Sequence, residues 1–283
     1  MKLNYQVWYR PQPTDEIRTK SHPRIVFLHG MGGTGALWRP IAASLEETAE
    51  LLALDQRGHG KSQIPHTPGG RVAPSYTPLD YGNDVIETLG NLHFHPTWIV
   101  GHSMGVRTAV AAAHLCPKWV QGLVLIDLGF SGVAGGGLGE DLATFIKVLP
   151  ESFENRESAR NFMAENCPDP SIAQYLMAVS VREDSGRITF PFEHSALIQT
   201  IHAARDASVR EWVRELGSKQ IPIHILRGQN SRVWTHEEFE LERQEFSRFP
   251  SIHWIEFPGA GHGLPFEQRP AFVDYLRKTC TSA

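Results

Sequence analysis

Short apolar runs alternate with amphipathic segments along the first half of the chain. Residues 24–28, 51–54, 98–100 and 123–126 are almost wholly apolar, as is typical of strands buried on both faces. Between these runs, residues 37–45, 85–92 and 104–115 carry apolar side chains at helical spacing. Strands that alternate with helices predict a parallel sheet with helices on both faces.

Two local patterns add detail to this first half. Leu3, Tyr5, Val7 and Tyr9 alternate with other residues and predict a half-buried strand at residues 3–9. The sequence Thr77-Pro78-Leu79-Asp80 predicts the start of a helix, with the threonine as its capping residue.

The alternation stops after residue 128 and resumes at residue 221. The stretch between predicts helices at 140–149, 157–166, 171–180 and 194–216, with an extended excursion at 182–192. So long a stretch is unlike a loop of a compact domain, and it predicts a separate helical layer. We expect a core made of residues 1–128 and 217–283, and a helical cap, or lid, over residues 129–216. The core resumes with strands at 221–226 and 252–257 and helices at 236–249 and 267–278.

Composition narrows the class of protein. The 283 residues are 41% hydrophobic, with a net charge of −4, so neither a nucleic acid nor an anionic membrane surface is expected as partner. No apolar run approaches the length of a membrane span, and the first twenty residues lack the apolar region of a secretory signal. Three distant cysteines predict neither a disulfide framework nor a metal site. We therefore expect a cytoplasmic monomer or homodimer that acts on a small molecule without metal or cofactor.

The strongest chemical signal is Gly101-His102-Ser103-Met104-Gly105. It lies between the predicted strand at 98–100 and the predicted helix at 104–115, the setting of a nucleophile elbow. In such a turn the serine hydroxyl is exposed, and small residues are needed on either side. We predict Ser103 as a nucleophile.

A serine nucleophile needs a base and a group that orients the base. In this type of sheet reactive groups gather at the carboxyl ends of the strands. His262 follows the last predicted strand in a run of small residues, and it is the predicted base.

The acid has more than one candidate. The loop after the strand at 221–226 has no carboxylate before Glu237, and its Asn230 and Ser231 could only hydrogen-bond an imidazole. Asp127 closes the strand that follows the elbow helix, so it is the predicted acid. Two different assignments stay open: Asp127 could only stabilise the turn that leads into the lid, through an Asx-type hydrogen bond, or Asp55 at another strand end could be the acid.

The remaining candidates would bind the substrate. The backbone amides of Met31 and Met104 are the predicted oxyanion hole. Gly30, His102, Arg227 and Trp234 are secondary candidates for substrate contacts. Arg107 is expected to form a structural ion pair; an arginine at 107 or 227 that faces the pocket would instead favour an anionic substrate.

Four motifs together resemble the α/β-hydrolase superfamily. They are His29-Gly30-Met31-Gly32, Asp55-Gln56-Arg57-Gly58-His59-Gly60-Lys61-Ser62, Gly101-His102-Ser103-Met104-Gly105 and Gly261-His262-Gly263. The resemblance implies a three-layer α/β fold with a mostly parallel eight-stranded sheet and a helical cap inserted after the sixth strand. It also implies that the strand at 3–9 is antiparallel. Many members have their acid after the strand that matches 221–226, but some take it from the strand that ends at Asp127.

The predicted function is therefore hydrolysis of a small to medium carboxylic ester through an acyl-serine intermediate. Three different functions stay open: a carbon–carbon bond hydrolase acting on a vinylogous diketone, a hydrolase of an amide or of a substituted acrylate or succinate, and a binding protein that keeps the fold without turnover.

Overall fold

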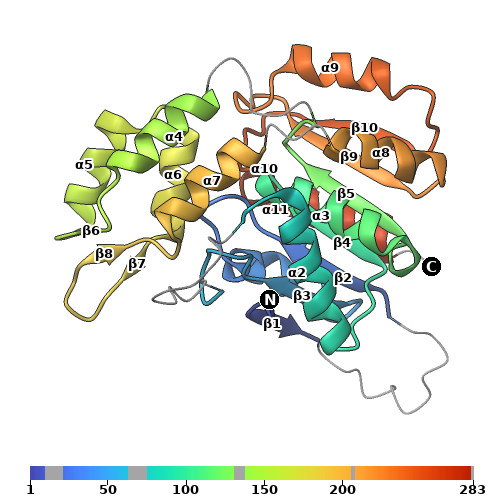
Figure 1. Ribbon diagram of the computed structural model, residues 1–283, viewed down its shortest axis with the longest axis horizontal. Coiled ribbons are helices and arrows are strands. Elements are labelled where there is room, and N and C mark those ends of the chain that lie inside the picture. The colour runs from blue at the N-terminus through green and yellow to red at the C-terminus, as the bar shows by residue number, and fades with distance from the viewer. Residues whose placement is uncertain (10–21, 63–74, 131–137, 205–207, 282–283) are drawn as a thin grey trace.

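The computed structural model describes residues 1–9, 22–62, 75–130, 138–204 and 208–281. Within these residues a seven-stranded sheet runs through the centre of the molecule (Figure 1). Its order is β1 (Tyr5–Trp8), β3 (Glu50–Leu54), β2 (Arg24–Leu28), β4 (Trp98–His102), β5 (Gly122–Ile126), β9 (Ile223–Gly228) and β10 (Ile252–Phe257). The strands are parallel except for β1, which pairs antiparallel with β3.

The mostly parallel sheet is confirmed, with one difference in strand number. The described residues place seven strands in this sheet, against the eight that the resemblance implies, and β1 is one of its two edge strands. The predicted residues 3–9 also face differently from what their alternation indicates, because Tyr5 and Val7 are exposed. A strand at the edge of a sheet can leave such side chains in solvent, and of the four alternating residues only Leu3 is fully buried.

Helices cover both faces of the sheet, which makes the three expected layers. One face packs on α2 (Pro78–Asn91), α3 (Met104–Leu115), α8 (Ser208–Ser218) and α9 (His236–Glu245). The other face packs on η2 (Gly35–Trp38), α1 (Arg39–Ala42), α10 (Leu264–Glu267) and α11 (Arg269–Leu276). The short helices η3 (Pro117–Trp119) and η5 (Arg277–Thr281) complete this part. Alternate residues of the central strands enter the two apolar clusters, as the continuous apolar runs predict.

A second lobe lies beside the sheet, where Figure 1 draws it from green to gold. It consists of α4 (Leu138–Val148), α5 (Arg156–Asn166), α6 (Pro170–Val179) and α7 (His194–Ala203). A small sheet of β6 (Ser152–Phe153), β8 (Ile188–Thr189) and β7 (Val181–Arg182) accounts for the extended excursion. The lobe has an apolar cluster of its own, which includes Phe145, Met163, Leu176 and Leu197.

The predicted helix at 194–216 is two helices, α7 and α8, and they belong to different parts of the molecule. Val209, Val213 and Leu216 of α8 are fully buried in the apolar cluster that contains α3 and the sheet. The core therefore begins again at α8, one helix before the boundary expected at residue 216. Residues 205–207, between the two helices, lie outside the described residues.

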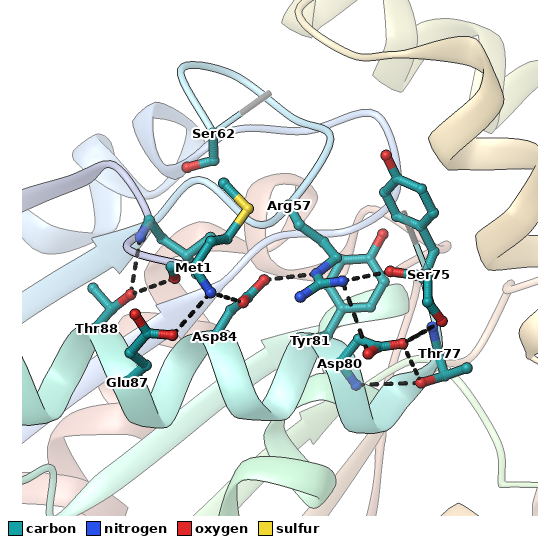
Figure 2. A network of polar contacts seen from close by, with 12 residues as sticks. Met1, Arg57, Ser62, Ser75, Thr77, Asp80, Tyr81, Asp84, Glu87 and Thr88 are labelled. Atoms are coloured by element: carbon teal, nitrogen blue, oxygen red, sulfur yellow. Dashed lines mark hydrogen bonds and ion pairs between the residues drawn. The ribbon is translucent and has the colours of Figure 1, made fainter. Parts of the chain in front are cut away.

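The start of α2 has the predicted cap. The Thr77 side chain accepts a hydrogen bond from the backbone N–H of Asp80, and the Asp80 carboxylate accepts one from the N–H of Thr77. Figure 2 shows these two reciprocal hydrogen bonds beside Arg57. Nε of Arg57 donates to the carboxylate of Asp84, which also belongs to α2, at 2.6 Å. The ion pair joins the loop after β3 to α2, so the motif around residues 55–62 is anchored to the helical layer.

No helix in the described ranges is long and apolar enough to cross a membrane. Cys116, Cys167 and Cys280 are all free thiols.

Candidate active site

Ser103 lies at the turn between β4 and α3, with a backbone φ of 53° and ψ of −121°. Residues with a side chain rarely adopt this conformation, so the turn is strained. A Cβ at Gly101 would meet the backbone of Gly105, and a Cβ at Gly105 would meet the carbonyls of Leu28 and His29. The two glycines are therefore required by close backbone packing, and the serine is presented at the carboxyl end of β4.

Three side chains from distant parts of the chain converge at this turn. Nε2 of His262 lies 3.1 Å from Oγ of Ser103, and Nδ1 of His262 lies 2.7 Å from Oδ2 of Asp127. Asp127 follows β5 and His262 follows β10, so all three lie at carboxyl ends of strands. An imidazole that donates from Nδ1 to a carboxylate keeps Nε2 as an acceptor for the serine proton.

The Asp127 carboxylate is fully buried and has two further donors. Oδ1 accepts a hydrogen bond from the backbone N–H of Gly228 at 2.8 Å, and Oδ2 accepts one from the Ser231 hydroxyl at 2.5 Å. Asp127 itself has a positive φ of 57°. These bonds fix the carboxylate and compensate its burial.

His102, next to Ser103, holds the loop that carries His262 in place. Its Nε2 lies 2.8 Å from the carbonyl oxygen of His262, so Nε2 carries the proton that is donated. Burial, with a smaller contribution from the neighbouring His262, lowers the pKa of His102 to about 3. His102 is therefore a neutral hydrogen-bond donor that supports the position of His262.

The loop after β2 passes beside the serine. A Cβ at Gly30 would lie 3.1 Å from Cβ of Ser103, so the backbone of this loop is in direct contact with the nucleophile. Met104 is the first residue of α3, where a backbone N–H has no acceptor within its helix. Met31 and Met104 both line the cavity that contains Ser103.

The cavity lies between the core and the cap lobe. The core contributes Gly30, Met31, His102, Ser103, Met104, Arg107, Leu128, Val233 and His262, and α4, α6, α7 and the residues next to them contribute Gly139, Leu142, Ile172, Tyr175, Thr200, Ile201 and Ala204. Most of these side chains are apolar, as in pockets that bind small organic molecules. Among the described residues, Arg107 is the permanently charged side chain of its wall.

Comparison with known proteins agrees with this fold. The sequence profile described as the alpha/beta hydrolase family matches residues 25–274, most of the chain. The chain belongs to the alpha/beta hydrolase family.

Two relatives and one solved structure illustrate the range of this family. The 2-(acetamidomethylene)succinate hydrolase of Mesorhizobium japonicum is 28% identical over 252 residues, covering 88% of this chain and 85% of the relative. The sn-1-specific diacylglycerol lipase ABHD11 of Mus musculus is 28% identical over 260 residues, covering 89% and 79%. A marine microorganism esterase has a TM-score of 0.74 at 21% identity over 98% of each chain, a likeness that shows the fold alone.

Two residues predicted to contact the substrate of this hydrolase lie elsewhere. Arg227 is buried, donates from Nε to the carbonyl of Trp234 at 2.9 Å and from Nη2 to that of Ser231 at 3.2 Å, and pairs with Glu256. Trp234 is buried against Phe239 and Trp254. Neither side chain lines the cavity, because both are used to fold the loop that presents Ser231 to Asp127.

Three residues of the hydrolase's site have more definite places than the sequence indicates. Ser231 donates its hydroxyl to Asp127 and not to the imidazole of His262. The sequence of this loop gives no signal that selects Asp127 as the partner. Arg107 is buried and faces the cavity, a place that its position one turn after Ser103 makes possible. Tyr175 of α6 reaches over to the loop after β2, with its hydroxyl 3.4 Å from the carbonyl oxygen of Gly30. No sequence signal selects Tyr175 among the aromatic residues of the cap.

Metal ligation has no support in the geometry. Across the parts of the chain that the structure describes, no group of three or more histidine, cysteine, aspartate or glutamate side chains could hold a metal ion. Independence from metals and cofactors stays a prediction.

Proposed function

We propose that this hydrolase cleaves small to medium carboxylic esters by acyl transfer to water. The observation that carries the proposal is the continuous chain of hydrogen-bonding groups from Ser103 through His262 to Asp127, at 3.1 and 2.7 Å. Ser103 and His262 line a mainly apolar cavity, which suits the acyl or alcohol part of an ester.

Each residue has a defined part in the proposed reaction. Oγ of Ser103 attacks the ester carbonyl as Nε2 of His262 takes its proton, and Asp127 orients the imidazole and balances its positive charge. The backbone amides of Met31 and Met104 bind the oxyanion. His262 then protonates the leaving alcohol, which leaves an acyl-serine. Water deprotonated by His262 releases the acid and restores Ser103.

A second candidate substrate class is favoured by Arg107. The Arg107 side chain lines the cavity one helical turn from Ser103, and its Nη2 lies 3.4 Å from the carbonyl oxygen of Gly129. A carboxylate on the substrate would be attracted to this positive charge. The relative named 2-(acetamidomethylene)succinate hydrolase acts, by its name, on a compound that carries carboxylates. We therefore propose anionic esters, or amides of substituted acrylates and succinates, as the second class beside neutral esters.

A carbon–carbon bond hydrolase and a non-catalytic binding protein are told apart from an esterase by one experiment. The former would use the same three residues on a vinylogous diketone, and the latter would show no turnover. A cytoplasmic location and a monomeric or homodimeric state also stay predictions.

The test is a substrate panel. Purified protein is assayed with p-nitrophenyl esters graded by acyl length, with monoesters of succinate, with 2-(acetamidomethylene)succinate and with a vinylogous diketone. Ser103→Ala is the control, and a fluorophosphonate probe reports whether Ser103 is a reactive nucleophile. We expect turnover of short to medium esters and labelling of Ser103 in the native protein only. Turnover confined to the diketone, or folded protein that is neither labelled nor active, would overturn the proposal.

The same panel decides between neutral and anionic substrates. If the anionic class is correct, Arg107→Gln raises KM for the succinate monoesters by about tenfold or more, because it removes a charge-assisted contact. KM for neutral esters of the same length should change little. Equal changes for both classes would assign Arg107 a structural role.

A further inference from the structure

The loop that carries Met31 is held by hydrogen bonds on both sides of that residue. On one side, the carbonyl oxygen of Gly30 accepts from the N–H of Gly33 at 3.0 Å and lies 2.8 Å from Nδ1 of His29. On the other side, the N–H of Gly32 donates to Nε2 of His59 at 3.0 Å. The carbonyl of Gly30 and the N–H of Met31 belong to one planar peptide unit and point in opposite directions. Fixing the neighbouring groups therefore fixes the direction of the Met31 N–H.

Both histidines act in a single neutral tautomer. Nε2 of His29 accepts from the N–H of Gln56 at 3.0 Å, so its proton is on Nδ1 and is donated to Gly30. Nε2 of His59 accepts from Gly32, so its proton is on Nδ1, which lies 2.8 Å from the carbonyl oxygen of Arg57. Burial lowers the pKa of His29 to about 4 and that of His59 to about 3. The rings are 5.1 Å apart, so a proton on either would disfavour one on the other.

His59 also lies where the cap meets the core. The N–H of Gly60 donates to the carbonyl of Pro191 at 2.6 Å, and the N–H of Glu193 donates to the carbonyl of Gly58 at 2.9 Å. His59 and Phe192 thus form an isolated antiparallel bridge. The residue that holds Gly32 is itself held by the cap segment 191–193, which leads into α7 and the cavity wall.

We propose that His59 is a positioning residue for the oxyanion hole. Its neutral imidazole accepts the Gly32 N–H, and this bond sets the orientation of the Met31 amide while seating the loop on cap segment 191–193. His59 touches no reacting atom, because it acts through Gly32. The inference rests on the proposed function for the role of the Met31 amide, but the Gly32–His59 bond can be tested without turnover.

Three variants test the role in catalysis. His59→Leu removes the acceptor, His59→Gln restores one near the place of Nε2, and His224→Leu is the matched control. His224 is a half-buried histidine whose pKa is also lowered, to about 4, but it lies on β9 and bonds Tyr275, away from the loop. We expect His59→Leu to lower kcat about tenfold to a hundredfold with KM nearly unchanged, since an oxyanion contact acts mainly in the transition state. Affinity for a trifluoromethyl ketone, which forms a tetrahedral adduct on Ser103, should fall by the same factor.

His59→Gln should recover most of kcat, and His224→Leu should keep it even if both leucine variants melt at a lower temperature. A folded His59→Leu protein with wild-type kcat and inhibitor affinity would overturn the inference. So would equal losses of kcat in His59→Leu and His224→Leu.

A measurement on the wild-type protein decides the bond itself. A two-bond ¹⁵N–¹⁵N scalar coupling between the Gly32 amide and Nε2 of His59 is expected, together with slow exchange of the Gly32 amide proton. Absence of the coupling with fast exchange would overturn the inference even if no variant folds. A wild-type protein without turnover but with the coupling would overturn the proposed function and leave the loop's anchoring at His59 supported.

Discussion

The Asp127 carboxylate lies 2.7 Å from Nδ1 of His262. Asp127 follows the end of β5 and not the end of β9. The two strands are neighbours in the sheet, so their carboxyl ends open at the same place. The loop after β9 has no carboxylate near the imidazole. Instead the last residue of β9, Gly228, donates its backbone N–H to Asp127, and Ser231 of the loop donates its hydroxyl. One strand end therefore provides the acid, and its neighbour provides the groups that hold it.

Asp127→Asn should lower kcat by about 10³–10⁴-fold while the fold stays intact. An amide cannot balance the imidazolium charge, and its NH₂ group would favour the wrong tautomer of His262. The measurement is kcat on the best ester of the panel, with circular dichroism to confirm folding.

Asp55→Asn is the matched control for that experiment, because Asp55 accepts from the backbone N–H groups of Gly35 and Lys61 and from the Asn4 amide. It should cost stability and leave kcat nearly unchanged. Near-normal turnover of Asp127→Asn, with loss in Asp55→Asn, would assign the acid to Asp55.

Ser231→Ala should lower kcat by about tenfold and leave KM nearly unchanged. The alanine removes one of the two hydrogen bonds that hold Asp127 beside the imidazole, but the bond from Gly228 remains. Steady-state kinetics measure the effect. Ser218→Ala, at an exposed site on α8, is the control and should behave as wild type. A loss as large as that of Asp127→Asn would mean that Ser231 does more than support the acid.

Much of the fold is encoded in local pattern. The apolar runs predict the ends of every central strand to within about two residues, because a strand buried on both faces must be apolar throughout. The alternation at residues 3–9 misleads about its buried face, because an edge strand is only partly covered and tertiary contacts decide which side chains enter the core.

The site could be predicted only as far as strand order brings residues together. Ser103 and His262 follow strands, so their meeting at one edge is a consequence of topology. Arg227 and Trp234 also lie near that edge, but their side chains turn into the loop that they stabilise. Which way a side chain turns depends on packing and on unsatisfied carbonyl groups nearby, and these are set by the fold. For the same reason the cavity wall from the cap could not be predicted.

Asp84→Ala should destabilise the protein by about 3–5 kcal/mol, because it leaves the largely buried Arg57 guanidinium without its main partner. Figure 2 shows Arg57 between Asp84 and Asp80, and the more distant Asp80, at 4.0 Å, replaces little of the lost contact. Urea unfolding measures the change. Glu87→Ala, an exposed carboxylate on the same helix, should change stability by less than about 1 kcal/mol. Similar effects of the two substitutions would contradict a buried structural pair.

Acid should destabilise the protein well before its carboxylates are protonated. Burial lowers the pKa of His29 to about 4, and of His59 and His102 to about 3, from the ordinary value of 6.5. Below pH 6.5 the unfolded chain therefore binds protons that the folded protein excludes. Stability is lost as the pH falls from about 6.5 towards the folded-state values, with a slope of about 1.4 kcal/mol per pH unit for each histidine.

Substitution separates this effect from other causes of acid unfolding. His59→Gln removes one titrating group, so the slope of unfolding free energy against pH between 6 and 4 should fall by about 1.4 kcal/mol per unit. His224→Gln, which removes another histidine with a lowered pKa at a distant site, should reduce the slope by a similar amount, and the double variant should show the sum. Urea unfolding at several pH values gives the slopes. An unchanged slope in His59→Gln would mean that His59 is already protonated in the folded protein, which its acceptor role towards Gly32 does not allow.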